Sequence, residues 1–293
     1  MIGLEREENM IQDIAPHKLN KEFQIKKPEK SAFIIHVENN KILLKGTKEE
    51  PHAFLSVQEL EADIPNIYDK AMYLFAVDEQ EFFLLKDEEL PEHEERHYYN
   101  PNFFRTFQPK EYAFATITGI QLDRWYKSRK FCGRCGAENE PGTKERSLIC
   151  PTCGNTEYPK LCPAVIIALV HGNRILLSKY AGREYKNFAL LAGFVEYGET
   201  LEDTVRREVM EEVGLKVGKM VYYKSQPWAL SDSLLAGFYV ELEGSEEITL
   251  EEEELAMAEW YEREEIPVSD STANSLTNEM IMKFKNGFKP FNK

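Results

Sequence analysis

The chain has 293 residues, a formal net charge of −15 and 42% hydrophobic residues. This length suits one large domain or two medium domains with a sizeable core. The acidic balance argues against a general nucleic-acid-binding surface, which would be basic. No stretch approaches the roughly 20 apolar residues of a membrane span, and the polar start, residues 1–20, indicates no signal peptide. We therefore expect a cytoplasmic protein with no membrane partner.

Three segments share one pattern, in which an apolar run, a short polar turn and a second apolar run predict a β-hairpin. They cover residues 33–44, 73–85 and 165–177. The first two indicate a β-rich N-terminal domain, for which we predict the boundaries 1–128. A helix is predicted over residues 111–130, and it leads directly into a cysteine-rich segment.

Four cysteines, Cys132, Cys135, Cys150 and Cys153, form two C-x2-C pairs separated by fourteen residues. A glycine follows the second cysteine of each pair. This spacing is close to that of a zinc ribbon with four thiolate ligands, in which zinc has a structural role. Disulfides are the alternative, which a cytosolic setting disfavours. We predict a ribbon over residues 129–157 that binds one Zn²⁺ per chain.

The segment 193–215 follows the pattern G-x5-E-x7-R-E-U-x-E-E-x-G-U, in which U is an apolar residue. The defined positions are Gly193, Glu199, Arg207, Glu208, Val209, Glu211, Glu212, Gly214 and Leu215. A helix is predicted over residues 200–213, with Thr200 as its cap and Asp203 completing a capping box. Gly214 stands where the end of a helix favours a left-handed residue.

Three glutamates of this helix, Glu208, Glu211 and Glu212, lie at i, i+3 and i+4 and share one face. Like charges so close repel unless a cation lies between them, and carboxylate oxygens suit Mg²⁺ or Mn²⁺. An exposed acidic helix with ordinary caps is the alternative. It does not explain Arg207, Glu199 and the glycines at fixed offsets.

Further elements follow the 193–215 segment. Strands are predicted at residues 220–224, 235–241 and 257–261, and a final helix at residues 272–285. Residues 246–254 are strongly acidic and predict a solvated loop. Strands and helices mixed in this way indicate an α+β sandwich.

The 193–215 pattern is the signature of the Nudix hydrolases, and this chain resembles them at every defined position. The cysteine ribbon and Ser225-Gln-Pro-Trp228 make the arrangement similar to that of the NADH pyrophosphatase family. The resemblance implies a Nudix α/β/α sandwich with a mixed sheet over residues 158–293. It also implies hydrolysis of NAD(H) to nicotinamide mononucleotide and AMP, removal of NAD caps from RNA 5′ ends, and a homodimer.

The resemblance further implies a set of site residues. The catalytic positions are Glu199, Arg207, Glu208, Glu211 and Glu212. The Mg²⁺ or Mn²⁺ ligands are Glu208, Glu211, Glu212 and the carbonyl of Ala192. The substrate-binding positions are Glu145, Tyr158, Phe194, Gln226, Pro227, Trp228, Ser233 and Ala273. For Tyr158, Trp228 and Ala273, simple packing is the alternative.

This sequence departs from the family pattern at two places. The family continues Ser-Gln-Pro-Trp with Pro-Phe-Pro, but here residues 229–231 read Ala-Leu-Ser, which loosens the loop. The family also has a metal-binding glutamate three residues before a tryptophan, and Met257 takes that place before Trp260. A thioether is a poor ligand for Mg²⁺, and Glu254 and Glu259 are the nearby carboxylates.

The substitution at Met257 leads us to expect an altered metal number, slower turnover or a shifted substrate. Two other functions stay open. One is hydrolysis of a different nucleoside diphosphate derivative such as ADP-ribose. The other is a nucleotide sensor without catalysis, which Met257 favours and the complete 193–215 pattern disfavours.

Overall fold

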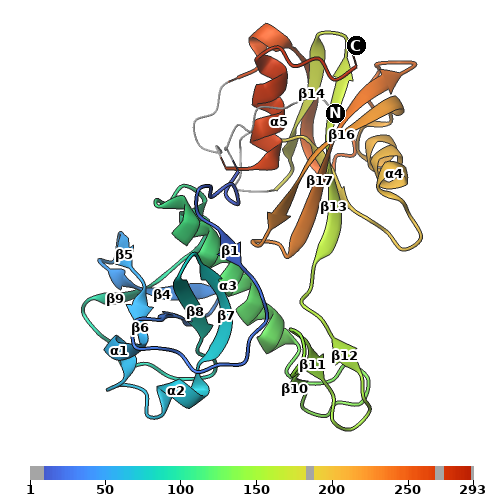
Figure 1. Ribbon diagram of the computed structural model, residues 1–293. Coiled ribbons are helices and arrows are strands. Elements are labelled where there is room, and N and C mark those ends of the chain that lie inside the picture. The colour runs from blue at the N-terminus through green and yellow to red at the C-terminus, as the bar shows by residue number, and fades with distance from the viewer. Residues whose placement is uncertain (1–9, 183–187, 268–273, 292–293) are drawn as a thin grey trace. The chain divides into compact units, whose positions relative to one another are not determined.

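A computed structural model of the chain describes residues 10–182, 188–267 and 274–291 (Figure 1). The chain forms two compact units, one of residues 11–160 and one of residues 161–293 together with Met10. None of the helices in the described ranges is both long enough and apolar enough to cross a membrane.

The unit of residues 11–160 is rich in short strands (Figure 1). Its strands are β1 (Leu19–Asn20), β2 (Phe33–Ile35), β3 (Val37–Glu38), β4 (Lys41–Gly46), β5 (Pro51–Ala53), β6 (Leu55–Ser56), β7 (Met72–Val77), β8 (Gln80–Leu84), β9 (Arg96–Tyr99), β10 (Glu140–Pro141), β11 (Leu148–Ile149) and β12 (Thr156–Glu157). Its helices are α1 (Val57–Leu60), α2 (Ile67–Lys70), the 3₁₀ helix η1 (Pro101–Arg105) and α3 (Lys110–Ser128).

These strands form three separate sheets within the described residues. The orders are β1-β7-β8-β2-β6, β3-β4-β5 with β9 beside β4, and β10-β11-β12. Helix α3 confirms the helix predicted at residues 111–130 to within two residues at each end. The β-rich character of the N-terminal region is therefore as expected.

Both hairpins predicted in this region form. Strands β7 and β8 pair antiparallel with Val77 opposite Gln80, and β3 and β4 pair with Val37 opposite Ile42. The first hairpin differs in one respect, because its leading apolar run breaks at His36. Strand β2, before the break, pairs in parallel with β8 in another sheet. His36 is buried, with Nε2 2.8 Å from the carbonyl oxygen of Glu88.

The second unit is built on a mixed sheet. Its elements are β13 (Cys162–His171), β14 (Arg174–Tyr180), β15 (Leu191–Phe194), α4 (Leu201–Val213), β16 (Lys216–Trp228), β17 (Ser233–Glu243), β18 (Leu255–Glu262), the 3₁₀ helix η2 (Arg263–Glu265) and α5 (Leu276–Lys285). The strand order is β16-β17-β13-β14-β18, and β15 pairs with β13. Strand β13 runs parallel to β17 and antiparallel to β14 and β15.

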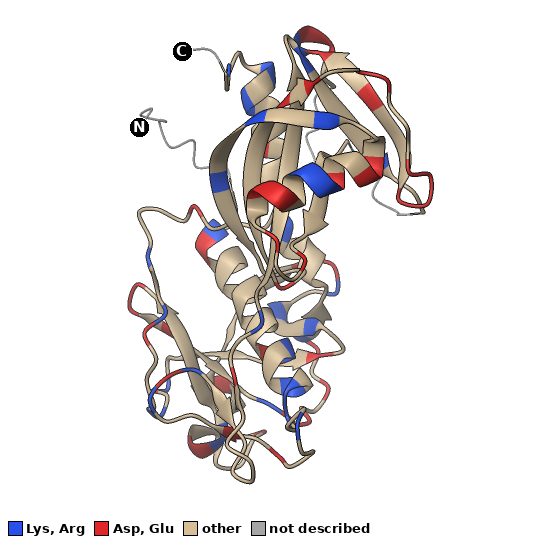
Figure 2. Ribbon diagram, turned by 90° about the vertical axis from the view of Figure 1, so that its right-hand side faces the viewer, with Lys and Arg blue, Asp and Glu red and all other residues tan. Residues whose placement is uncertain are grey.

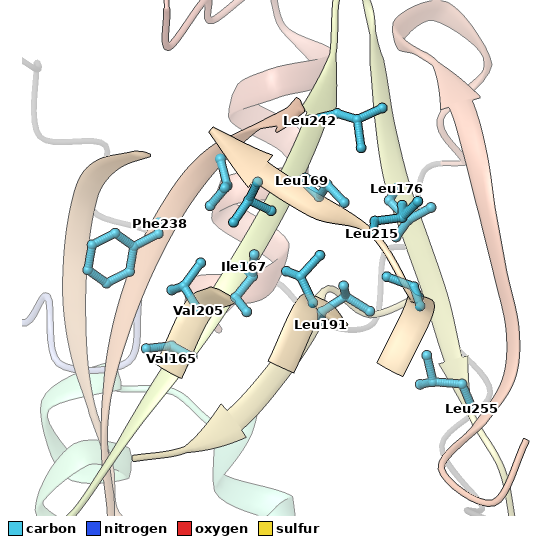
Figure 3. Packing of buried hydrophobic residues seen from close by; sticks show 14 of the residues in the cluster. Val165, Ile167, Leu169, Leu176, Leu191, Val205, Leu215, Phe238, Leu242 and Leu255 are labelled. Atoms are coloured by element: carbon cyan, nitrogen blue, oxygen red, sulfur yellow. The ribbon is translucent and has the colours of Figure 1, made fainter. Parts of the chain in front are cut away.

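Alternate residues of β13 pack on opposite faces of this sheet. Val165, Ile167 and Leu169 pack with residues of α4 that include Val205 (Figure 3). On the opposite face, a second buried cluster joins β13 to α5. Its β13 and α5 members are Ile166, Ala168, Val170, Leu276, Met280, Ile281 and Phe284. A strand buried on both faces requires the continuous apolar run seen in the sequence, so the sheet lies between α4 and α5 in the expected sandwich.

Helix α4 has defined caps at both ends. The Thr200 hydroxyl oxygen accepts the N–H of Asp203 at 3.1 Å, as predicted. The same hydroxyl donates to the Asp203 carboxylate at 2.7 Å, so the two side chains bond to each other. At the other end, Gly214 has a φ of +68°, and its N–H donates to the carbonyl of Met210 at 3.0 Å. The caps at Thr200 and Gly214 are therefore confirmed, but Asp203 bonds to the Thr200 hydroxyl in place of the backbone N–H that a capping box uses.

The segment 244–254, between β17 and β18, is attached to the end of α4; we call it the acidic loop. The N–H of Thr249 donates to the carbonyl of Val213 at 3.0 Å, and the N–H of Glu251 donates to the carbonyl of Glu212 at 3.0 Å. These carbonyls belong to the last turn, where a helix supplies no partners of its own. The acidic loop is thus exposed, as expected, but docked on the helix.

We expect Gly214→Ala to destabilise the protein more than Gly244→Ala. Both glycines have positive φ, +68° and +87°, so alanine is strained at each by roughly 1–2 kcal/mol. A Cβ at Gly214 would also lie 3.0 Å from the Cβ of Thr249, whereas nothing lies within 4 Å at Gly244. Urea unfolding would measure the difference, and equal losses would show that the contact with Thr249 contributes nothing.

Candidate metal and substrate site

The entry to α4 brings the backbone of β15 against a glutamate of the helix. Gly193 is paired with Val165, whose side chain lies in the core facing α4. A Cβ added to Gly193 would overlap the carboxylate of Glu208. Glu208 is 8% exposed, so its carboxylate occupies the space that a side chain would take. Position 193 therefore requires glycine for a steric reason.

Arg207 is bonded to three glutamates of the 193–215 segment. Its Nε donates to Glu199 Oε1 at 2.7 Å and its Nη2 to Glu199 Oε2 at 3.0 Å, which is a bidentate pair. Its Nη1 donates to Glu208 Oε1 at 2.7 Å and to Glu211 Oε2 at 2.9 Å. Nη2 also donates to the carbonyl of Phe194 at 2.9 Å. Arg207 thus orients the carboxylates and ties α4 to β15.

These contacts separate the pKa values of the carboxyl groups. The hydrogen bond from Arg207 lowers the pKa of Glu199 to about 2, so Glu199 is ionised at neutral pH. Burial raises the pKa of Glu208; Arg207 opposes this effect, and the charges of Glu211 and Glu254 add to it. A raised pKa means that the ionised form of Glu208 is disfavoured until further positive charge approaches.

A cleft of about 590 Å³ opens beside α4. It is lined by Arg207, Glu208, Glu211, Glu251, Glu253 and Glu254. In Figure 2, α4 carries a basic stretch with acidic residues before and after it. Glu212, which follows Glu211 on α4, is buried, with 2% of its surface exposed. Carboxylate oxygens are the donors that Mg²⁺ and Mn²⁺ favour, so the residues present fit a divalent cation.

The acidic loop is the part of this cleft that sequence reasoning placed in solvent. The sequence predicts a solvated loop there, whereas Glu251, Glu253 and Glu254 line the cleft beside the helix. Helical periodicity gives no signal for such a segment, because backbone bonds to Glu212 and Val213 hold it. The four consecutive glutamates at 251–254 were the available hint.

Met257 lies on β18 opposite Lys179, next to an irregularity in the strand pairing. Ala258 and Trp260 pack against the core that faces α4. Because side chains alternate along a strand, Glu259, which lies between Ala258 and Trp260, projects to the face that carries α5. Of the two nearby carboxylates, Glu254 therefore lines the cleft and Glu259 does not.

Gln226 is fully buried and bonded to the start of α5. Its Oε1 accepts the N–H of Leu276 at 2.8 Å, and its Nε2 donates to the carbonyl of Asn274 at 3.1 Å. The amide therefore joins β16 to the helix that covers the second face of the sheet. Its predicted contact with substrate stays a prediction. Ala273, predicted beside it, lies outside the described residues.

The remaining predicted residues of this unit lie near the ends of strands. Phe194 is 54% exposed at the end of β15. Trp228 pairs with Ser233, and Pro227 with Leu234, where β16 turns into β17. The turn between them is closed by Ser233 Oγ, which donates to the carbonyl of Ser231 at 3.1 Å. The expectation of a loosened loop stays untested.

Two predicted residues lie together in the other unit. Tyr158 is 56% exposed, and its hydroxyl donates to Glu145 Oε1 at 2.9 Å.

The carbonyl of Ala192, the remaining predicted metal ligand, belongs to β15 in the second unit, where Ala192 lies opposite Ile166.

The four predicted zinc ligands converge. Their sulfur atoms all lie within 4.8 Å of one another, with Cys132 and Cys153 at 3.7 Å and Cys135 and Cys150 at 3.4 Å. Zn–S bonds of about 2.3 Å in a tetrahedron place sulfurs about 3.8 Å apart, whereas a disulfide needs about 2.05 Å. The geometry therefore fits zinc.

Backbone N–H groups of the two knuckles lower the pKa of two of the four thiols, whereas the neighbouring thiols raise that of Cys135. The N–H of Cys153 contributes most to lowering the pKa of Cys150 to about 6, and that of Arg134 lowers the pKa of Cys132. Thiolates are the form that binds metal. The glycines after each pair, Gly136 and Gly154, have φ of +79° and +71°, which explains their position in the motif.

Comparison with known proteins agrees with this geometry. Residues 160–284 match the model of the NUDIX domain, and residues 127–158 match the NADH pyrophosphatase zinc ribbon domain. The chain is 41% identical over 150 residues to "NAD-capped RNA hydrolase NudC" of Escherichia coli O1:K1 / APEC, covering 51% of this chain and 58% of the relative. The values for the protein of that name from strain SMS-3-5 / SECEC are the same.

The chain thus spans somewhat more than half the length of the curated relatives that it matches. Among solved structures, a NUDIX hydrolase from Nitrosomonas europaea is similar with a TM-score of 0.47 and 24% identity, over 56% of this chain and 96% of that chain.

Residues 160–284 of the second unit are therefore a Nudix domain, and all the residues that line the carboxylate cleft lie within this range. The cysteine cluster before it is the metal site of a zinc ribbon of the NADH pyrophosphatase type. The chain therefore combines a zinc ribbon domain of this type with a Nudix domain that follows it.

We expect the unmodified protein to bind one zinc ion per chain and the Cys150→Ser variant to lose it. This substitution deletes one of four ligands, so the purified protein should hold far less than one equivalent and melt at a lower temperature. Cys162→Ser is the control, since Cys162 lies outside the cluster. Metal analysis by mass spectrometry would give the stoichiometry, and full zinc content in Cys150→Ser would contradict the assignment.

We expect Gly193→Ala to weaken Mn²⁺ binding by at least about tenfold, because the new methyl group displaces the Glu208 carboxylate. Gly218→Ala, on β16 of the same sheet, is the control, since its Cβ would lie 3.7 Å from that of Glu243 at ordinary contact distance. Titration of Mn²⁺ followed by electron paramagnetic resonance would compare them. Unchanged affinity in Gly193→Ala would show that the position of Glu208 is unimportant.

Proposed function

We propose that this chain hydrolyses the diphosphate of NAD(H) to nicotinamide mononucleotide and AMP, using Mg²⁺ or Mn²⁺. The observation that carries the proposal is the cleft in which Arg207 orients Glu208 and Glu211 beside the acidic loop. The zinc ribbon type and the name of the relatives direct the choice of substrate toward NAD.

In the proposed mechanism, Glu208 and Glu212 hold the cation, with Glu211 and the carbonyl of Ala192 as further ligands. When bound, the cation neutralises charge on the phosphate oxygens and lowers the pKa of a coordinated water. Glu211 or Glu212 would orient or deprotonate the attacking water for in-line displacement at phosphorus. The bridging P–O bond then breaks, so each product keeps one phosphate.

Arg207 has a positioning role in this scheme. Its bidentate bond to Glu199 fixes the guanidinium, and the remaining donor directions point at Glu208, Glu211 and Phe194. Because Glu199 is ionised and only partly exposed, it holds Arg207 in one orientation. The metal-binding carboxylates thereby keep their places before substrate arrives.

The substrate-binding residues are proposed by resemblance. Phe194 offers an exposed ring that suits stacking on nicotinamide, and Tyr158 an exposed ring for a base, with Glu145 bonded to its hydroxyl. The other members of the proposed set are Gln226, Pro227, Trp228, Ser233 and Ala273.

A homodimer in the cytoplasm is part of the proposal, as is the division into residues 1–128, 129–157 and 158–293. Four thiols arranged for zinc support a reducing compartment. Light scattering after gel filtration would determine the oligomeric state.

An NAD-capped RNA 5′ end is a second candidate substrate, which the name of the relatives favours. The net charge of −15 adds no support for RNA, so a capped-RNA assay is the direct test.

We expect NADH with Mg²⁺ or Mn²⁺ to yield reduced nicotinamide mononucleotide and AMP, and Glu212→Gln to lower kcat by orders of magnitude. The substitution keeps the size of the side chain but removes a charge from the metal site. Glu202→Gln, on the exposed first turn of α4, is the control and should leave turnover unchanged. Chromatography of the products would follow the reaction.

ADP-ribose assayed in parallel distinguishes the alternatives. Faster turnover of ADP-ribose than of NADH would assign the chain to a different nucleoside diphosphate derivative. Absence of AMP with every substrate and metal would favour a nucleotide sensor. Turnover of NADH by Glu212→Gln at the rate of the unmodified chain would contradict the assigned role of Glu212.

A further inference from the structure

We infer that Glu254 supplies a carboxylate ligand to the divalent cation held by α4, so that the acidic loop is part of the metal site. The inference rests on the metal-dependent hydrolysis proposed above. It adds a residue from outside the 193–215 segment, and it follows from how the loop is anchored and where its charges lie.

The backbone around Glu254 is fixed from two directions. The N–H of Glu251 is bonded to the last turn of α4, and the carbonyl of Glu251 accepts the N–H groups of Glu254 at 3.2 Å and Leu255 at 2.9 Å. From the end of β14, the N–H of Ala181 donates to the carbonyl of Glu254 at 2.9 Å. The Leu255 side chain is fully buried in the core facing α4. Glu254 is therefore held at one position beside the helix.

The glutamate side chains of the acidic loop differ in whether their carboxylates already have a hydrogen-bond partner within the loop. Glu251 Oε1 accepts the N–H of Glu253 at 3.2 Å, so this carboxylate stabilises the turn itself. The Glu254 carboxylate lines the cleft, and no hydrogen bond or ion pair to it is found among the described residues. Glu253 also lines the cleft, but Glu254 is the better fixed of the two, because its carbonyl accepts the N–H of Ala181 and the next residue, Leu255, is buried.

This arrangement brings negative charge to the cleft from both sides. Arg207 bonds to Glu208 and Glu211 but not to Glu254, so the repulsion between Glu208 and Glu254 is not relieved by an arginine contact at the loop side. A divalent cation between α4 and the loop relieves it and gains an oxygen ligand. On β18, Met257 has no carboxylate, and Glu259 projects to the opposite face.

The test compares Glu254→Gln with Glu252→Gln in the full-length protein. Glu252 belongs to the same loop and loses the same charge, but it does not line the cleft. Mn²⁺ is titrated without substrate, and free Mn²⁺ is measured by electron paramagnetic resonance. The buffer contains 0.5 M KCl, which reduces the range of general charge effects to roughly 4 Å. Circular dichroism and thermal melting in EDTA verify that each variant is folded.

We expect Glu254→Gln to weaken Mn²⁺ binding about tenfold and Glu252→Gln to leave it unchanged. Equal weakening in both variants would reduce the effect to general charge and overturn the inference, as would unchanged binding in Glu254→Gln. Glu208→Gln serves as the reference, because it removes a proposed metal ligand on α4 and should itself weaken Mn²⁺ binding. If Glu208→Gln loses Mn²⁺ while Glu254→Gln does not, the proposed function stands and this inference fails. If neither substitution affects Mn²⁺ binding, the metal site itself is wrong.

Discussion

The Nudix domain is organised around the concentration of carboxylates on one helix and the guanidinium of Arg207, which bonds to three glutamates. Glu208 is buried, although burial disfavours its charge. Arg207 makes this possible by bonding to Glu208 and Glu211, and it is held in turn by Glu199. The fixed offsets in the sequence follow from this network, because one guanidinium has to reach acceptors on the helix and on the loop before it.

The sheet supplies the rigid support for this network. Strand β13 is buried on both faces, with α4 packed on one and α5 on the other. Its pairing with β15 sets Gly193 directly beneath Glu208. A glycine at that position removes the side chain that would otherwise keep the carboxylate away from the strand. The chemistry of the helix therefore depends on a backbone contact fixed by strand register.

The parts of the site that the sequence predicted are those determined by local spacing. The start of α4 at Thr200, its end at Gly214 and the shared face of its glutamates all lie within 23 consecutive residues of the pattern. The two cysteine pairs are equally local. Gln226 and the acidic loop are different, because their positions depend on bonds to the start of α5 and the end of α4. The partners in these bonds are backbone groups, which almost every residue has, so the sequence does not indicate which of them will meet.

The position of the acidic loop also changes the significance of Met257. A missing carboxylate on β18 weakens the site only if the other ligands come from the helix alone. Here the helix brings a second source of carboxylates with it, since the carbonyls of Glu212 and Val213 anchor the loop. Ligands from α4 and from a loop docked on α4 move together, whereas a ligand from β18 would fix the cation relative to the sheet. A bound cation should therefore restrict motion of the acidic loop relative to α4 more than it restricts motion of α4 relative to β18.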